Sequence, residues 1–121
     1  MIYTSYFAKL KNLPEDVIPV SICGKAPCWY EGFQYKVLAP KYDFFNTWKE
    51  NHDNDYYIKC YNERVLSQLD YSVVISDLLR FSQGKDICLL CYEKPEDFCH
   101  RHLVAKWLND NGIDCKEYNF K

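Results

Sequence analysis

The sequence has little of three features that would assign a class at once: long apolar runs, an excess of one charge, and common phosphate-binding motifs. No apolar stretch approaches the ~18 residues of a membrane span, so a transmembrane segment is excluded. The 121-residue chain has a formal net charge of −2, whereas bulk binding to duplex nucleic acid needs a basic surface. Neither a Walker pattern nor G-x-G-x-x-G occurs. A pocket for one nucleotide or one flipped base stays open.

A secretory signal is also missing, because no basic N-terminal region precedes a long apolar stretch. We therefore expect a cytoplasmic protein with no membrane partner. The seven cysteines are then expected to be mostly buried thiols rather than a disulfide framework. Cys60 and Cys115, which lie in amphipathic patterns, belong to that buried group.

The composition favours one domain over residues 1–121, since 48% of the residues are hydrophobic and 17% are aromatic. Apolar spacing and turn residues predict strands over four segments: 2–7, 17–22, 87–91 and 113–118. Helical segments are expected as a turn or short helix over 8–13, a short helix capped by Asp43, and helices over 55–69, from Asp70 to Gly84, and over 96–110. Pro19 indicates that the second strand lies at an edge or starts after the proline. Residues 23–42 are expected to form a long loop, which in a small domain is often functional.

The apolar run at 87–91 predicts the fold class. Such a run is typical of a strand buried on both faces, which indicates an α/β domain with a mainly parallel sheet of about four strands flanked by helices. Ligands of such sheets bind at the carboxyl ends of the strands. We expect four residues to meet Cys91 and Glu93 at that edge: Tyr6, Ser21, Cys23 and Gly24.

Residues 87–102 hold the main candidate site. Glu93 follows the strand and is either a solvated loop carboxylate or helix cap, or a general acid/base or a stabiliser of positive charge at a sugar carbon. The role expected of Cys99 depends on where the next helix starts. Asp97 as N-cap places it in the first turn, where the helix dipole favours a thiolate. Pro95 at the first helical position leaves it deeper and structural.

The residues that follow Cys99 have alternatives too. His100 precedes the apolar positions of its helix by three or four residues, so we expect it to face the sheet, either as a packed residue or as one that orients or serves catalysis. Arg101 lies on the flank of the helix and binds a phosphate or pairs with Glu93. His102 is expected on the exposed face.

A zinc site is a weaker interpretation of the same stretch. Cys88 and Cys91 form C-x-x-C, but residues three apart on a strand point to opposite faces. A set of Cys88, Cys91, Cys99 and His102 would need the strand to end early. The stretch also lacks the two well-separated pairs of a familiar zinc module. We therefore assign no metal and no cofactor.

The segment after the second strand is a second candidate region. Gly24 and Lys25 follow that strand and are placed to hold an anion. Trp29 and Tyr30 either stack a base or cover the core.

Two strings near the C-terminus, LLCYE at 89–93 and CHR at 99–101, resemble the signature of domain-of-unknown-function family 488. YTSY at 3–6 is similar to that family's first strand. The middle of the chain resembles the YeaO-like branch through LAP at 38–40, Trp48 and YNE at 61–63. The resemblance implies a compact Rossmann-like α/β domain. It also implies candidate site positions at Cys91, Glu93, Cys99, His100 and Arg101.

The chain departs from that family at one place. Family members commonly have Asp-Val-Arg at the end of the second strand, where this chain has Ser21, Ile22 and Cys23. An acid and a base are therefore both absent. This branch then uses other groups, such as Lys25, or its chemistry is altered or lost.

Three classes of function fit these residues. The first is a small enzyme that acts on a nucleotide, nucleoside or nucleic-acid base, with Glu93 as acid/base or charge stabiliser. Cys91, Cys99 and His100 would assist, Arg101 would contact a phosphate, and Trp29 or Tyr30 would stack the base. The second is a non-catalytic binding module, for example a host- or phage-encoded accessory protein. The third is a zinc or thiol-redox protein.

Overall fold

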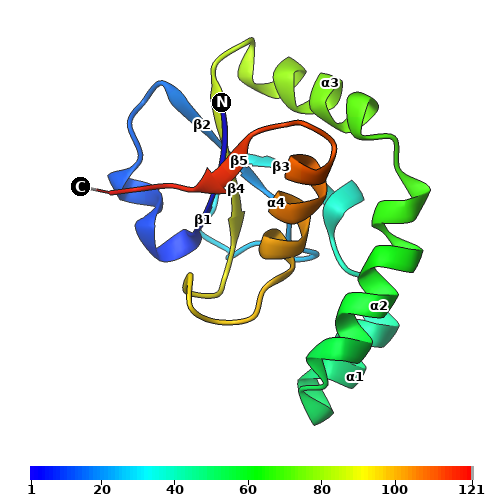
Figure 1. Ribbon diagram of the computed structural model, residues 1–121. Helices are drawn as coiled ribbons and strands as arrows, with labels where there is room; N and C mark the ends of the chain where they lie inside the picture. Colours follow the sequence, from blue (N-terminus) through cyan, green and yellow to red (C-terminus); the bar gives the residue numbers. More distant parts are fainter. Residues whose placement is uncertain (121) are drawn as a thin grey trace.

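A five-stranded, all-parallel β-sheet runs through the centre of the protein (Figure 1), in the order β3-β2-β4-β1-β5. The computed structural model describes residues 1–120. Its strands are β1 (Ile2–Tyr6), β2 (Val17–Ser21), β3 (Phe33–Gln34), β4 (Asp86–Cys91) and β5 (Cys115–Glu117). The prediction of a single α/β domain with a parallel sheet is confirmed. The sheet has one strand more than predicted, because residues 33–34 pair with β2 inside the expected loop.

Helices flank this sheet and lie between its strands in the sequence. The α-helices are α1 (Tyr42–Asn51), α2 (Asn54–Arg64), α3 (Tyr71–Ser82) and α4 (His100–Asp110). The 3-10 helices are η1 (Phe7–Asn12), η2 (Lys36–Leu38) and η3 (Leu66–Gln68). Helices α1 and α2 lie side by side and extend away from the sheet (Figure 1). Within residues 1–120, none of the helices has the length and apolarity of a membrane span.

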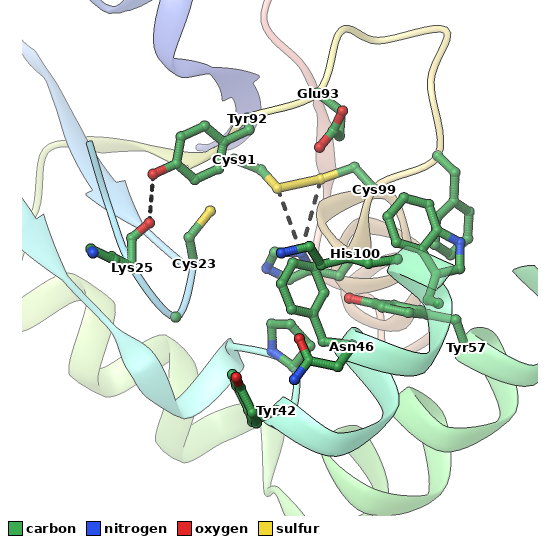
Figure 2. A pocket seen from close by; sticks show the side chains of 16 residues that line it. Cys23, Lys25, Tyr42, Asn46, Tyr57, Cys91, Tyr92, Glu93, Cys99 and His100 are labelled. Carbon is green, nitrogen blue, oxygen red and sulfur yellow. Dashed lines mark hydrogen bonds between the residues drawn. A yellow bond between two sulfur atoms is a disulfide. The ribbon is translucent and has the colours of Figure 1, made fainter. Parts of the chain in front are cut away.

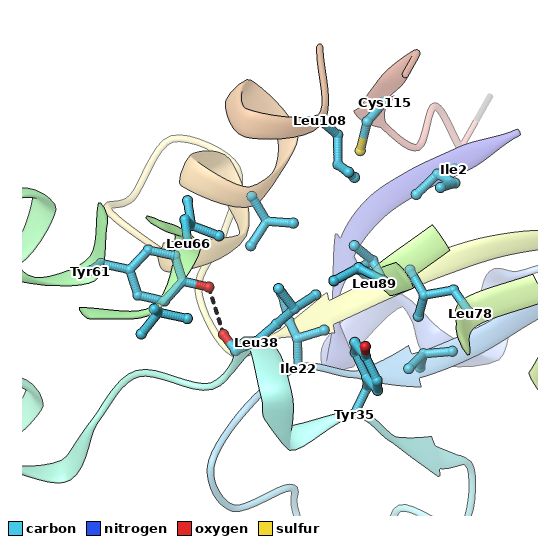
Figure 3. Close-up of a cluster of buried hydrophobic side chains, with 14 of the residues drawn as sticks. Ile2, Ile22, Tyr35, Leu38, Tyr61, Leu66, Leu78, Leu89, Leu108 and Cys115 are labelled. Carbon is cyan, nitrogen blue, oxygen red and sulfur yellow. Dashed lines mark hydrogen bonds between the residues drawn. The ribbon is translucent and has the colours of Figure 1, made fainter. Parts of the chain in front are cut away.

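Strand β4 is the central strand and is buried on both faces, as its apolar run predicted. Leu89 points into the core between the sheet and the helices (Figure 3), and Ile87 belongs to the same cluster. Cys88 and Leu90 point into a second cluster on the opposite face. Apolar side chains therefore pack against β4 on both faces of the sheet.

The neighbours of β4 bring several carboxyl ends together. Tyr6 pairs with Cys91 and Ser21 pairs with Leu90, so β1, β2 and β4 end at the same edge of the sheet. The prediction for Pro19 was partly wrong, because β2 lies inside the sheet rather than at its edge. The short β3 pairs only with Val20 and Ser21, and Pro19 therefore lies beside a stretch that β3 does not cover.

The helix ends follow local signals in some places and not in others. Asp70 caps α3 as predicted, since its carboxylate accepts the N–H of Ser72 at 2.9 Å. The chain leaves that helix through Gly84, whose φ is +85°. The cap predicted at Asp43 was wrong. Helix α1 begins at Tyr42, and Asp43 lies in its first turn, where it pairs with Arg64 at 2.6 Å.

Helix α4 begins later than predicted. Cys99 is its N-cap, so neither Asp97 nor Pro95 starts it. Residues 94–97 instead form a turn, in which the N–H of Asp97 donates to the carbonyl of Lys94 at 3.0 Å. A loop over residues 92–99 therefore connects β4 to α4 and lies beside the carboxyl edge of the sheet (Figure 1).

Candidate functional site

A pocket of about 560 Å³ opens at the carboxyl ends of β2 and β4 (Figure 2). The segments after these strands form one side, and α1, α2 and the start of α4 form the other. Its walls are mainly aromatic, with six rings from α1, α2 and the loop over residues 92–99: Tyr42, Phe45, Trp48, Tyr57, Tyr92 and Phe98. Pockets for small ligands have this size and apolar character.

The rings of the pocket support one another. The rings of Trp48 and Phe98 lie 5.5 Å apart, and that of Tyr57 lies 5.0 Å from Phe98, edge to face. Trp48 donates its indole N–H to Asn54 at 2.7 Å, which fixes the plane of its ring. Helices α1 and α2 thus hold a wall of ordered rings against the loop over residues 92–99.

Charged groups lie at the margin of this wall. Lys25 and Lys49 are exposed, and Glu93 is half-buried. The main chain of Lys25 is held by Tyr92, whose hydroxyl donates to its carbonyl at 2.6 Å. The pocket therefore combines two cations and one carboxylate with an apolar interior.

The floor contains the sulfur atoms of the candidate site. Cys91 and Cys99 form a disulfide (Figure 2), and the free, buried thiol of Cys23 lies beside them. Cys99 is thus in the bridged state, and neither the expected first-turn thiolate nor the expected buried structural thiol is present. Cys60 and Cys115 are free and buried, as predicted.

His100 faces inward, as predicted, and joins this floor. Its Nε2 lies 2.7 Å from the carbonyl of Ile22, so Nε2 carries the proton that it donates. Its Nδ1 lies 3.5 Å from the sulfur of Cys91 and 3.9 Å from that of Cys99. Burial, followed by the positive charge of Arg101, lowers the pKa of His100 to about 4. The imidazole is therefore neutral near pH 7, with its lone pair at Nδ1.

Arg101 does not lie on the pocket wall, and the expectations of a flank position and a Glu93 ion pair were wrong. Its side chain is fully buried. The carboxylate of Glu117 in β5 accepts hydrogen bonds from the Arg101 Nε at 3.2 Å and from its Nη2 at 3.0 Å. Its Nη1 donates to the main-chain carbonyl of Glu93 at 2.6 Å. The charge lies over the ring of Tyr6 at 5.8 Å. Arg101 thus holds the backbone at Glu93 and leaves the Glu93 carboxylate free.

Four other predicted ligand positions do not line the pocket. Tyr6 faces Arg101, and Ser21 is buried and accepts the N–H of Cys23 at 3.3 Å. Trp29 is 56% exposed on the other face of the sheet, beside Phe7. Tyr30 is buried there, and its hydroxyl donates to the carbonyl of Phe33 at 2.7 Å. The expected convergence at this edge therefore holds, since Tyr6 pairs with Cys91 and Ser21 with Leu90, but only Cys23 and Gly24 of the four residues line the pocket.

The sequence did not identify the residues of α1 as part of the site. Tyr42, Asn46 and Lys49 line the pocket, yet they were not singled out. The apolar side of this helix, with Phe45 and Trp48, was the available signal. It was ambiguous because such a stripe commonly faces a core.

Of the four zinc ligands considered in the sequence, only Cys91 and Cys99 are brought together. Cys88 points into the second core, and His102 lies on α4 with Nε2 3.2 Å from the carbonyl of Asp97. A different set is close: donor atoms of Cys23, Cys91 and His100 all lie within 4.8 Å of one another.

The fold is a small parallel α/β domain with a pocket at the carboxyl edge of its sheet. A family model described as the Active DUF488-N3 subclade matches residues 6–112. The chain therefore belongs to the DUF488 family, as its motifs predicted. Neither the curated proteins nor the solved structures gave a significant match.

Proposed function

We propose that the pocket binds a nucleotide or nucleoside and that the protein acts on it as an enzyme in the cytoplasm. One observation carries the proposal: an aromatic pocket at the carboxyl edge of the sheet has Lys25, Lys49 and Glu93 at its margin. Parallel α/β proteins bind their ligands at this edge. The family match is to a subclade described as active, which also supports an enzyme.

The proposed binding mode assigns each group by its chemistry. A base stacks on the rings of α1, since base–aromatic stacking tolerates any base and contributes about 1–3 kcal/mol. A phosphate pairs with Lys25 or Lys49, because an ammonium donates charge-assisted hydrogen bonds to phosphate oxygens. The sugar then lies between them, near Glu93.

Glu93 is the proposed catalytic residue. Arg101 holds its main-chain carbonyl at 2.6 Å, and the Cys91–Cys99 disulfide closes the loop that carries it. The backbone at Glu93 is thereby held, while Arg101 pairs with Glu117 rather than with the Glu93 carboxylate. Such a group serves as general acid/base or stabilises positive charge that develops at a sugar carbon.

A binding module without catalysis is the second candidate. It is favoured by one observation: His100 and Arg101, the other polar groups of the motif, are both held by protein partners. Glu93 would then lack the second polar side chain that most acid/base sites contain.

Ligand binding can be tested by thermal shift and calorimetry with a panel of nucleosides and nucleoside mono-, di- and triphosphates. A bound ligand raises the melting temperature of the wild type. Trp48→Ala is expected to weaken binding about tenfold to a hundredfold through lost stacking. Trp29→Ala is the matched control and is expected to bind like the wild type, because Trp29 lies on the other face. No shift with any member of the panel, or equal losses in both variants, would refute the proposed pocket.

Catalysis is tested on the ligand that binds, by chromatography of the products. Glu93→Gln keeps the size of the side chain and is expected to bind normally while losing about 10²–10⁴-fold in turnover. Binding without turnover in the wild type would overturn the enzyme and favour the binding module.

A further inference from the structure

Four metal-binding side chains from three separate segments converge on the floor of the pocket. Cys23 follows β2, Cys91 ends β4, and Cys99 and His100 begin α4. All four are nearly buried, with exposed fractions of 4–5%. Thiolates and an imidazole are the ligands that zinc prefers in structural sites.

The spacing of these atoms fits one tetrahedral ion. Bonds of about 2.3 Å to sulfur and about 2.0–2.1 Å to nitrogen place a sulfur and a nitrogen ligand roughly 3.5 Å apart. Nδ1 of His100 lies 3.5 Å from the sulfur of Cys91 and 3.9 Å from that of Cys99. Cys23 and Cys91 each offer a sulfur atom, and His100 a ring nitrogen, that lie within 4.8 Å of one another. Small side-chain movements would bring all four atoms to one ion.

His100 is oriented as a metal ligand requires. Its Nε2–H donates to the carbonyl of Ile22 at 2.7 Å, which leaves the lone pair of Nδ1 directed at the sulfur atoms. Metal-bound histidines commonly donate their second ring nitrogen to such a carbonyl, which fixes the tautomer and the plane of the ring. The carbonyl belongs to the residue before Cys23, so one short segment of chain supplies a ligand and orients another.

The thiols of Cys23, Cys91 and Cys99 are buried away from water, so thiolates at these positions would need a compensating cation. A bound divalent cation would offset the cost of burying thiolates here. The net negative charge of a site with three thiolates would lie near the buried guanidinium of Arg101.

Only the reduced protein can supply all four ligands, because the disulfide removes two of them. The Cα atoms of Cys91 and Cys99 lie 7.3 Å apart, which is beyond the usual span of a disulfide. When Cys91 and Cys99 bind one ion, their sulfur atoms do not need to approach each other as closely as in a disulfide.

We propose that Cys23, Cys91, Cys99 and His100 of the reduced protein form a closed, four-ligand zinc site beneath the pocket. A dithiol reductant supplies two electrons and two protons to the disulfide and is itself oxidised to a disulfide. Zn²⁺ then binds three thiolates and Nδ1, and the three thiol protons go to solvent. With no open coordination position, the ion ties the ends of β2 and β4 to α4 and fixes the floor. The oxidised protein has the disulfide in its place.

The site is tested on the full chain, reduced with a phosphine and then freed of loose metal. Elemental analysis is expected to find about one zinc per chain, and zinc added to stripped, reduced protein should release about three protons. Co²⁺ in place of zinc should give the thiolate charge-transfer and tetrahedral ligand-field bands of a sulfur-rich site. The oxidised protein is expected to bind neither ion.

Two pairs of variants make the test specific. Cys23→Ser and His100→Gln are expected to lose stoichiometric zinc, whereas the controls Cys88→Ser and His102→Gln should keep it. Cys88 is a buried thiol of β4 outside the cluster, and His102 lies on the same helix as His100. The proton count and the cobalt spectrum use the wild type, so they decide the matter even if a variant fails to fold.

Absence of zinc from the reduced wild type, or equal zinc in Cys23→Ser and Cys88→Ser, would overturn the site. Nucleotide binding is measured separately on the same samples, so a failure of the zinc site is distinguishable from a failure of the proposed function.

Discussion

The buried ion pair between α4 and β5 gives the sharpest test of the structure. The carboxylate of Glu117 accepts two hydrogen bonds from Arg101, at 3.2 and 3.0 Å, and one from the hydroxyl of Thr4 at 2.7 Å. Glu117→Ala would leave a fully buried guanidinium without its counter-charge. We expect this substitution to be among the most destabilising polar changes in the chain.

The magnitude follows from the burial of each partner. Removing one partner of a buried pair costs about 3–5 kcal/mol, mostly from the uncompensated charge that remains. Here Arg101 is 0% exposed but the side chain of Glu117 is 28% exposed, so water partly solvates the site. The lower end of that range, about 3 kcal/mol, is therefore expected. A domain of this size has a total stability of about 5–15 kcal/mol, so the loss is a large fraction of it.

Urea unfolding followed by circular dichroism measures the loss. Asp110→Ala is the matched control, because Asp110 pairs with Lys106 on the same helix but both groups are well exposed. Exposed pairs contribute about 0–1 kcal/mol, so this variant should stay close to the wild type. The double variant Arg101→Met, Glu117→Ala should lose less than the sum of the two single losses, since it leaves no buried charge. A loss below about 1 kcal/mol in Glu117→Ala would refute the argument that the uncompensated buried charge of Arg101 destabilises the fold.

Two further predictions concern alkaline pH and backbone conformation. Burial raises the pKa of Tyr30 to about 12 and that of Tyr61 well above its usual value, so the stability that these neutral phenols provide is complete below about pH 10 and is lost as the pH rises through the folded pKa. Phenolate absorbance should show a late phase that coincides with loss of circular dichroism, and complete ionisation with the fold intact would contradict this. Gly84→Ala is expected to cost about 1 kcal/mol in urea unfolding because φ there is +85°. Gly24→Ala, in open space and without a positive φ, should cost nothing measurable, and equal losses would argue against the backbone explanation.

The elements that the sequence predicted well are those with strong local signals. Strand β4 is a continuous apolar run, and both of its faces are buried. Helix α3 begins at a capping aspartate and is followed by Gln83 and Gly84, which both have positive φ. In each case the residues that determine the element lie inside it or next to it, so no knowledge of the rest of the fold was needed.

The elements that the sequence missed depend on distant partners. Strand β3 has only two residues, both exposed, and exists because it pairs with Val20 and Ser21. The late start of α4 has the same kind of cause: a turn at 94–97, the bond from Arg101 to Glu93 and the link between Cys91 and Cys99 hold the preceding loop. Propensity alone cannot reveal such constraints.

The candidate site was predicted in part and missed in part. Its chemical groups, Cys91, Glu93, Cys99 and His100, were identified from one short stretch and do line the pocket. The aromatic wall was assigned to Trp29 and Tyr30, although it comes from α1 and α2. An apolar stripe on a helix has the same pattern whether it faces a core or a cavity, so the choice required the tertiary structure.

The loop that carries Glu93 is held at several points, and this favours catalysis over simple binding. Arg101 holds its first residues, the disulfide closes its two ends, and Tyr92 ties it to the main chain of Lys25, in the segment after β2. Acid/base groups need to be held within about 0.5 Å of their working position, whereas a carboxylate that only contributes affinity tolerates a mobile loop. Arg101 is itself fixed by Glu117, so the position of Glu93 depends on β5, the last strand of the chain. If Glu93 is catalytic, Glu117→Gln should lower turnover more than ligand affinity; if it only binds, both variants at Glu117 should affect stability alone.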